Sequence, residues 1–217
     1  MKKLTKQEYQ VLREGATVIE ADPFGEKVLL LSDGTYLKLF RARHLLSLAR
    51  IYPYSKRFIR NAQKLAEKGI PTVTVIELFR IPCIHRTAVH YSPLTGKTLK
   101  KLAGNIDLII INKLGRFIRE LHEKGIHFRS LHMGNIVVTP ENRLGLIDVA
   151  DMKIYRKPLD RELRLRNFQH TARYPEDMAA LMRFLPGFIQ GYQAREGSPF
   201  TTDELQDLLT TIYTKQK

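Results

Sequence analysis

Residues 125–151 of the 217-residue chain read GIHFRSLHMGNIVVTPENRLGLIDVAD, and this stretch decides the fold class. A predicted helix ends at Gly125, and a polar loop follows it. Two short apolar runs, Ile136–Val138 and Leu144–Ile147, then flank the turn at residues 139–142. We predict that these runs are buried strands that pair as a hairpin.

Two oxygen donors lie at the ends of this predicted hairpin. The Asn135 side-chain amide precedes its first strand, and the Asp148 carboxylate follows its second strand. Because the two ends of a hairpin lie close together, we expect the side chains to converge. Oxygen ligands suit Mg²⁺, which takes few protein ligands and completes its shell with water and phosphate. The sequence therefore predicts a magnesium site at Asn135 and Asp148.

Working outward toward the N-terminus, the pattern before residue 92 is mainly that of strands. Apolar runs alternate with turn residues, and the Asp33-Gly34 pair between two such runs is a strong hairpin signal. A basic helical stretch interrupts them and ends at Gly69. The predicted elements are strands at 16–21, 27–31, 35–40, 73–79 and 87–91 and a helix at 55–68.

Lys38 is the only cation of the third predicted strand, on the same face as Tyr36 and Phe40. A lysine that faces a lobe interface needs an anion, and a nucleotide phosphate is one. The alternative is a surface lysine whose stem lies along an edge strand. In the same way, Asn135 and Asp148 have structural alternatives as residues that support or cap a turn.

After residue 96 the pattern becomes mainly helical. Apolar residues at helical spacing predict a helix over 112–124, and helices follow from about Arg161, broken at Pro175, Pro186 and Gly197. Strands followed by helices are typical of an α+β protein. We expect two lobes that meet near residues 91–96, with a ligand in the cleft between them.

Composition excludes several protein classes. With 43% hydrophobic and 27% charged residues, the chain is too apolar to be disordered. The single Cys83, between Pro82 and Ile84, allows no internal disulfide, and we expect it to be a packed thiol. The basic start has no apolar stretch behind it, and the aliphatic run Leu108–Ile111 is far too short to span a bilayer. We therefore expect a cytoplasmic protein.

The net charge of +14 predicts an anionic partner, such as nucleic acid, anionic lipid headgroups or phosphorylated glycolipid. No acidic residue occurs between Gly34 and Ala66. A solvated basic face without a partner is the alternative. The cations of this run are Lys38, Arg41, Arg43, Arg50, Lys56, Arg57, Arg60 and Lys64.

An ordered set of motifs over about residues 15–155 resembles the catalytic core of the protein-kinase-like fold. In particular it resembles the small bacterial branch that includes the lipopolysaccharide core kinases acting on heptose or 3-deoxy-octulosonic acid. Its loop usually reads Asp-Leu-His-Pro-Gly-Asn, and its metal-binding strand ends in Ile-Asp. The matching stretches are TYLKLFR (35–41) for the lysine strand, KLAEKGIP (64–71) for the end of helix C, YSPLTGKTL (91–99) for the hinge, LHMGN (131–135) for the loop and Ile147-Asp148 for the metal-binding strand.

The resemblance implies an α+β, two-lobed, protein-kinase-like fold in a single domain of residues 1–217. It implies a small β-rich N-lobe at residues 1–91, a hinge at 92–96 and a helical C-lobe at 97–217. It also implies phosphoryl transfer to a sugar hydroxyl of the lipopolysaccharide core, with an anionic glycolipid as the acceptor. Such a protein would work at the cytoplasmic face of the inner membrane, in peripheral contact with it.

The resemblance further implies ATP and Mg²⁺ as cofactors. Lys38, Gly25 and Tyr91 would contact the nucleotide, and Asn135 and Asp148 would bind the metal. The first hairpin has no Gly-x-Gly-x-x-Gly motif and offers only Gly25 at its turn. We therefore expect this turn to bind the nucleotide phosphates only weakly.

The catalytic loop departs from the family pattern. With Asn135 aligned to the metal asparagine, Ser130 stands where the family has its catalytic aspartate, and Phe128 stands where many kinases have a histidine. Serine has no negative charge with which to accept or orient the proton of the attacking hydroxyl. If the protein is catalytic, His132 and Asp151 are the nearest candidates for that role. His132 is also predicted to brace the loop by a hydrogen bond.

Helix C departs from the family pattern as well. The family's helix C offers a glutamate to the strand lysine, but no carboxylate lies between Gly34 and Ala66. Lys38 must therefore find another partner, and Asp148 is the candidate.

Two hypotheses of different classes remain open. One is an ATP–Mg²⁺-dependent phosphotransferase, and the other is a catalytically impaired, pseudokinase-like module that binds nucleotide or an anionic partner and regulates or scaffolds. A third, a nucleic-acid-associated protein, is disfavoured because the basic run lacks interleaved aromatic residues.

Overall fold

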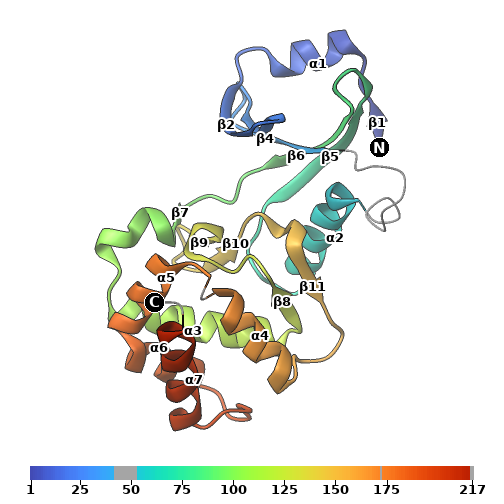
Figure 1. The fold of residues 1–217 in the computed structure, drawn as a ribbon. Coiled ribbons are helices and arrows are strands. Elements are labelled where there is room, and N and C mark those ends of the chain that lie inside the picture. Colours follow the sequence, from blue (N-terminus) through green and yellow to red (C-terminus); the bar gives the residue numbers. More distant parts are fainter. Residues whose placement is uncertain (42–52, 172, 216–217) are drawn as a thin grey trace. The chain divides into compact units, whose positions relative to one another are not determined.

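The computed structural model describes residues 1–41, 53–171 and 173–215 and has a mixed α+β structure (Figure 1). Packing divides the chain into two compact units. The first comprises Met1–Leu94 together with Asp148–Ala150, and the second comprises Thr95–Ile147 and Asp151–Lys217.

The first unit is built on a six-stranded sheet. Its strands are β1 (Lys2–Lys3), β2 (Thr17–Asp22), β3 (Gly25–Leu30), β4 (Tyr36–Arg41), β5 (Thr74–Ile81) and β6 (Arg86–Ser92). Their order is β1-β5-β6-β4-β3-β2, and every neighbouring pair is antiparallel except β1 with β5. The five strands predicted in this part of the sequence are confirmed, whereas the two-residue β1 was not predicted.

The Asp33-Gly34 hairpin between β3 and β4 is also confirmed. The Leu31 amide donates to the Thr35 carbonyl at 2.8 Å, and Gly34 adopts a φ of 81°. This left-handed conformation favours glycine, which explains why the turn signal was reliable.

One face of the sheet is covered by helix α1 (Lys6–Arg13), which the sequence analysis did not predict. Tyr9 of α1 is buried in the same apolar cluster as Leu29 of β3. A capping box starts the helix, because the Thr5 side chain accepts from the Glu8 amide while the Glu8 carboxylate accepts from the Thr5 amide. The Thr5-x-x-Glu8 spacing was the signal for this helix.

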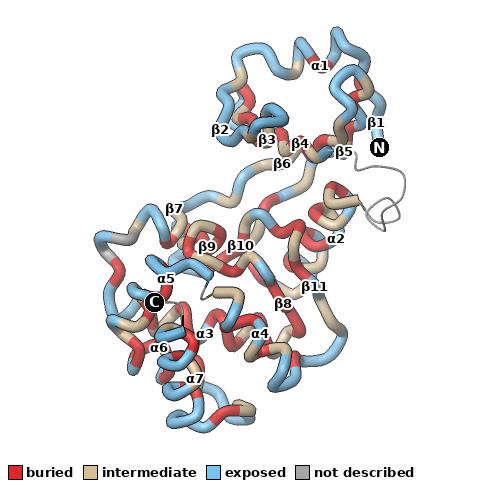
Figure 2. The backbone as a smooth tube through the Cα atoms, viewed as in Figure 1, coloured by how far each residue is buried: buried red, intermediate tan, exposed pale blue. Residues whose placement is uncertain are grey.

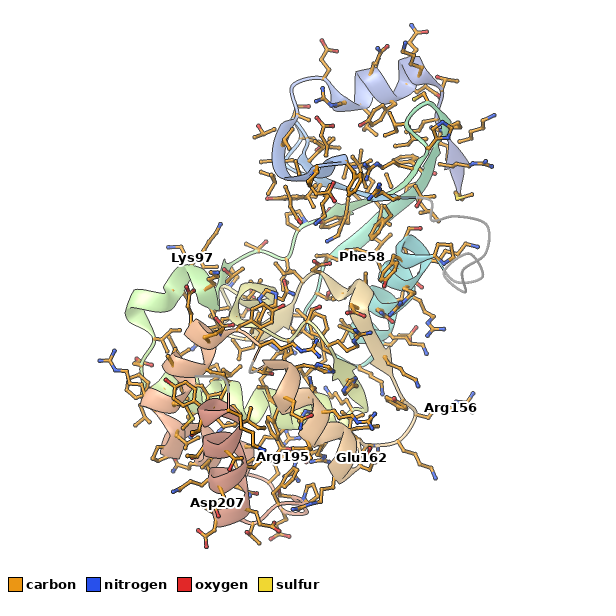
Figure 3. The ribbon with its side chains drawn as sticks, viewed as in Figure 1. Phe58, Lys97, Arg156, Glu162, Arg195 and Asp207 are labelled. Atoms are coloured by element: carbon orange, nitrogen blue, oxygen red, sulfur yellow. The ribbon has the colours of Figure 1, made fainter. Side chains whose placement is uncertain are left out.

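The other face of the sheet carries helix α2 (Tyr54–Glu67), which confirms the helix predicted over 55–68. Phe58, labelled in Figure 3, packs against Phe40 of β4 and Tyr91 of β6. The Thr87 hydroxyl donates to Ser55 at 3.1 Å. These contacts fix α2 to the sheet. Two members of the basic run, Arg43 and Arg50, lie outside the described residues.

The second unit is mainly helical, as the sequence predicted. Its helices are α3 (Leu108–Glu123), α4 (Arg161–Thr171), α5 (Pro175–Arg183), α6 (Leu185–Tyr192) and α7 (Thr202–Thr214). Pro175 and Pro186 lie in the first turns of α5 and α6, where proline does not interrupt the hydrogen bonds of the helix. Buried residues gather along α3 and α6 (Figure 2).

Helices α3 and α6 approach each other at glycines. A Cβ at Gly115 would lie 2.2 Å from the Phe188 carbonyl oxygen, and one at Gly191 would lie 2.0 Å from that of Asn112. Both positions therefore require glycine.

Short strands complete the second unit. They are β7 (Lys97–Thr98), β8 (Ile126–Phe128), β9 (Ile136–Val138), β10 (Leu144–Leu146) and β11 (Met152–Ile154). The antiparallel β9–β10 pair, with Ile136 opposite Leu146, confirms the hairpin predicted from residues 125–151.

The prediction that Cys83 is a packed thiol is wrong, because Cys83 is exposed. Its apolar neighbours suggested burial, but Pro82–Ile84 form a single 3-10 turn between β5 and β6 at the surface, where the chain reverses. Among the described residues, no helix combines the length and apolarity needed to cross a bilayer.

Candidate functional site

Lys38 and Asp148 form an ion pair within the first unit. The Lys38 Nζ donates to the Asp148 Oδ1 at 2.7 Å. The lysine side chain is 13% exposed and the aspartate side chain is 45% exposed. The partner that the sequence analysis suggested for Lys38 is therefore present, and the carboxylate remains open to solvent on one side.

The neighbours of Lys38 explain why it needs an acid. In the strand register Lys38 lies opposite Val28 on β3 and Val89 on β6, and both valines are buried. The Lys38 side chain therefore starts between two apolar side chains and is only 13% exposed, so its ammonium has lost most of its water, which is costly unless an anion replaces that water. Lys38 is therefore not a surface lysine on an edge strand, since β4 lies between β6 and β3.

The Asp148 backbone has an unusual conformation. Its φ is 54°, in the left-handed region that few residues other than glycine adopt. The two residues after it, Val149 and Ala150, are buried, and the Asn61 Nδ2 of α2 donates to the Val149 carbonyl at 2.7 Å. Packing and a hydrogen bond thus hold this segment in a conformation that the chain disfavours on its own.

Tyr91, the predicted nucleotide contact, lies on the Lys38 face of the sheet, two residues beyond Val89. Its ring stacks on Tyr36 with the centroids 5.7 Å apart. Burial raises the pKa of the Tyr91 phenol, and the Asp148 carboxylate raises it further. The phenol therefore stays protonated and can donate a hydrogen bond near Asp148.

Gly25 lies at the turn between β2 and β3 with a φ of 111°. Two arginines hold this turn, since Arg86 donates to the Phe24 carbonyl and the Arg41 guanidinium lies 3.6 Å from the centre of the Phe24 ring. Because β4 extends to Arg41, Lys38 is not the only cation of its strand, and that expectation was wrong. Arg41 lies on the same face of the strand as Leu39, and Lys38 lies on the other face.

In the second unit, Asn135 closes the loop that begins at Ser130. Its Nδ2 donates to the Ser130 carbonyl at 2.9 Å, and its backbone carbonyl accepts from the Ile147 amide at 3.0 Å. Because Nδ2 is engaged in this way, Oδ1 is the atom that Asn135 can offer to a metal ion.

His132 braces the same loop, as the sequence predicted. Its Nδ1 accepts from the Gly134 amide at 3.1 Å, and its ring lies against Tyr174, with the centroids 4.3 Å apart. The Gly134 amide thus occupies the Nδ1 lone pair of His132.

The other two predicted catalytic residues lie on the flanks of this loop. The Ser130 carbonyl accepts the Asn135 amide. The Arg129 guanidinium approaches the Asp151 carboxylate to 3.7 Å, and the Arg129 amide donates to the Asp151 carbonyl at 3.2 Å. Ser130, His132 and Asp151 thus belong to the second unit, together with Asn135.

The sequence analysis missed Asp177, which anchors this loop. Its carboxylate accepts a hydrogen bond from the Met133 amide, 44 residues away in the sequence. Burial raises the pKa of Asp177, while that hydrogen bond opposes the shift. No local pattern marks a contact of this range, so only the packing of α5 reveals it.

Asp148 and Asn135 each carry an oxygen of the kind that Mg²⁺ takes from proteins. Asp148, in the first unit, offers a carboxylate open to solvent, and Asn135, in the second unit, offers an amide oxygen. Within residues 1–41, 53–171 and 173–215, no group of three or more His, Cys, Asp or Glu side chains could hold a metal ion. A many-ligand metal centre therefore has no support in the described part of the chain.

Comparison with known proteins gives a distant structural match. No protein-family model matches the sequence, and no curated protein matches it. Among solved structures, 1612 chains match. One of them is a co-crystal structure of WbdD with the kinase inhibitor LY294002, which is 17% identical, with a TM-score of 0.47. The match covers 88% of this chain and 42% of that one, so the chain spans less than half the length of that structure.

Proposed function

We propose that this protein is a kinase-like phosphotransferase that binds ATP and Mg²⁺, with the first unit as its N-lobe and the second as its C-lobe. The observation that carries the proposal is the Lys38–Asp148 ion pair, which joins a strand lysine to the acid at the end of an Ile-Asp motif. In the phosphotransferase template, a strand lysine and a metal-binding aspartate serve the same phosphates.

The proposal gives each residue a role. Lys38 would contact a phosphate oxygen, and Tyr91 and Gly25 would lie beside the nucleotide. Asp148 and Asn135 would hold Mg²⁺, which on binding would neutralise charge on the transferred phosphate. Chain connectivity supports their pairing, because the Asn135 carbonyl accepts from Ile147, and Asp148 is the next residue.

The proposed acceptor is a sugar hydroxyl of an anionic glycolipid such as lipopolysaccharide core, reached by peripheral contact with the inner membrane. Helix α2 supports an anionic acceptor. Lys56, Arg60 and Lys64 follow one another at i, i+4 spacing, which places three cations along one side of the helix. A row of cations suits an anionic surface.

A second function is favoured by Ser130. The loop from Arg129 to Asn135 contains no carboxylate, so it lacks the group that orients the attacking hydroxyl in the family. A kinase-like module that binds nucleotide without transferring phosphate, and that regulates or scaffolds, is therefore the alternative.

The proposal is tested by calorimetric titration of ATP with MgCl₂ or with EDTA. Asp148→Asn should abolish the Mg²⁺-dependent part of the affinity, and the matched control Asp207→Asn, an exposed acid on α7 labelled in Figure 3, should leave it unchanged. Equal Mg²⁺-dependent affinity in wild type and Asp148→Asn would exclude the proposed metal role.

Transfer of the γ-phosphate to purified core glycolipid separates the two functions. Transfer of label to the glycolipid would support the phosphotransferase, whereas ATP binding without transfer at high protein concentration would support the regulatory module.

The acceptor surface is tested by a double substitution on α2. Lys56→Gln with Arg60→Gln should raise KM for glycolipid, and Lys2→Gln with Lys6→Gln serves as the control. Steeply salt-dependent binding to RNA instead would favour a nucleic-acid partner.

A further inference from the structure

Helix α2 contacts the metal-binding segment through an amide. Asn61 is 2% exposed, and its Nδ2 donates to the Val149 carbonyl at 2.7 Å in a buried position. We propose that Asn61 is a positioning residue for Asp148, acting through the Val149 carbonyl. The inference rests on the proposed function, since it concerns the carboxylate assigned there to Mg²⁺.

Helix α2 is packed on the sheet and therefore holds the Asn61 backbone in a fixed position. Phe58, Ala62 and Leu65 share the buried side of α2 with Asn61, and Phe58 packs against Tyr91 of the sheet with the ring centroids 5.3 Å apart. A side chain that projects from a helix held in this way has little freedom. The Asn61 amide therefore imposes a defined position on the carbonyl that it binds.

The carbonyl that Asn61 binds belongs to Val149, which directly follows Asp148 and its left-handed backbone conformation. Asp148 has a φ of 54°, a conformation that costs a non-glycine residue energy. Fixing the Val149 carbonyl fixes the orientation of the chain immediately after Asp148. With that orientation set, the Asp148 carboxylate meets the Lys38 Nζ at 2.7 Å.

This arrangement differs from the one that the family resemblance implied. There, a helix carboxylate holds the lysine. Here, the helix holds the chain after the aspartate, and the aspartate in turn pairs with Lys38. A shift of α2 would therefore act on Asp148 first and on Lys38 only through it.

A neutral amide suits this role better than an acid. Asn61→Asp replaces the donating Nδ2 with an oxygen, which repels the Val149 carbonyl and adds negative charge beside the Asp148 segment. Asn61→Ala removes the donor and leaves the buried carbonyl without that hydrogen bond. The control is Gln63→Ala, which removes an exposed amide from the same helix.

Nucleotide binding gives the first test, with ATP titrated in MgCl₂ and in EDTA. Asn61→Ala should weaken the Mg²⁺-dependent affinity by about tenfold and Asn61→Asp by more, while affinity in EDTA stays within about twofold. Gln63→Ala should match wild type in both buffers. An equal loss in both buffers would indicate a general structural role and overturn the proposal, as would no loss at all.

A mutant cycle gives a second test that needs no nucleotide. The coupling between Lys38→Met and Asp148→Asn is measured from unfolding equilibria, first in the wild-type background and then with Asn61→Ala. If Asn61 positions Asp148, the coupling should fall toward a factor of about one in the second background. An unchanged coupling refutes the positioning role even if nucleotide binds. Loss of coupling in a protein that binds no nucleotide refutes the proposed function alone.

Discussion

Lys38 and Asp148 are 110 residues apart in the sequence, yet Nζ and Oδ1 lie 2.7 Å apart, and the lysine is the more buried partner. The pair is therefore asymmetric. Removing the aspartate leaves a largely desolvated ammonium without its carboxylate, whereas removing the lysine leaves a carboxylate that water still reaches.

Substituting the two residues should therefore lower the free energy of unfolding by different amounts. Asp148→Ala is expected to cost about 1–3 kcal/mol of unfolding free energy, because it leaves the half-buried Lys38 ammonium without its carboxylate. Lys38→Met should cost less than about 1 kcal/mol, because methionine packs between the valines. Urea unfolding followed by circular dichroism measures both. A larger cost for Lys38→Met would show that the lysine is better hydrated than its exposure suggests.

Ser130→Asp restores the carboxylate that the family loop carries. If the rest of the loop is competent, γ-phosphate transfer to core glycolipid should rise by about 10²-fold or more, the range of a positioned acid or base. Ser130→Asn has a similar size without the charge and should give no such rise. A rate below wild type for Ser130→Asp would mean that serine is adapted to this loop.

Acid should destabilise the second unit through a buried histidine. His122 is enclosed between the Tyr192 hydroxyl at 2.8 Å and the Asn167 Oδ1 at 3.1 Å. Burial, reinforced by Arg164, lowers its pKa from 6.5 to about 3. As pH falls below 6.5, the unfolded chain takes up a proton that the folded one refuses until about pH 3. The stability present above pH 6.5 is therefore lost across this window.

The loss should be about 1.4 kcal/mol per pH unit for each such histidine. His127, whose pKa burial lowers to about 4, acts in the same direction. Urea midpoints between pH 7 and pH 4 measure the slope, and the exposed His85→Gln variant should reproduce it. An NMR titration in which the His122 C2 proton shifts near pH 6.5 would contradict this account.

Exposed Cys83 should react without unfolding. A maleimide reagent is expected to label the native protein at a rate close to that in urea, because the thiol lies on a surface turn. Cys83→Ser should remove all labelling. Protection that disappears only in urea would restore the original prediction of a packed thiol.

Sequence reasoning predicted the elements whose signals are local. The Asp33-Gly34 turn, the stripe of α3 and the hairpin after Asn135 each depend on a few adjacent residues, and each is confirmed. Helix α1 was missed although its signal, the Thr5–Glu8 capping box, is equally local. Its short length and polar composition concealed it.

The candidate site was less accessible from sequence. The Lys38–Asp148 pair was anticipated because the acid-free run left the lysine in need of an acid elsewhere. The Asn61 and Asp177 hydrogen bonds were not anticipated, because each joins residues far apart in the chain to a backbone group, and backbone groups leave no mark in a sequence. The prediction that Cys83 is packed was wrong because flanking apolar residues do not distinguish a buried segment from a surface turn.

The assignment of Asp148–Ala150 to the first unit has a practical consequence for dissecting the protein. A fragment ending at Leu94 would keep Lys38 and α2. It would lack Asp148, which pairs with Lys38, and Val149, whose carbonyl accepts from Asn61 of α2. The first unit is thus discontinuous in sequence, and its last piece is synthesised more than fifty residues after the rest. A fragment of residues 1–94 should therefore unfold at a lower urea concentration than the same unit does in the full chain, because it lacks the Lys38–Asp148 and Asn61–Val149 hydrogen bonds.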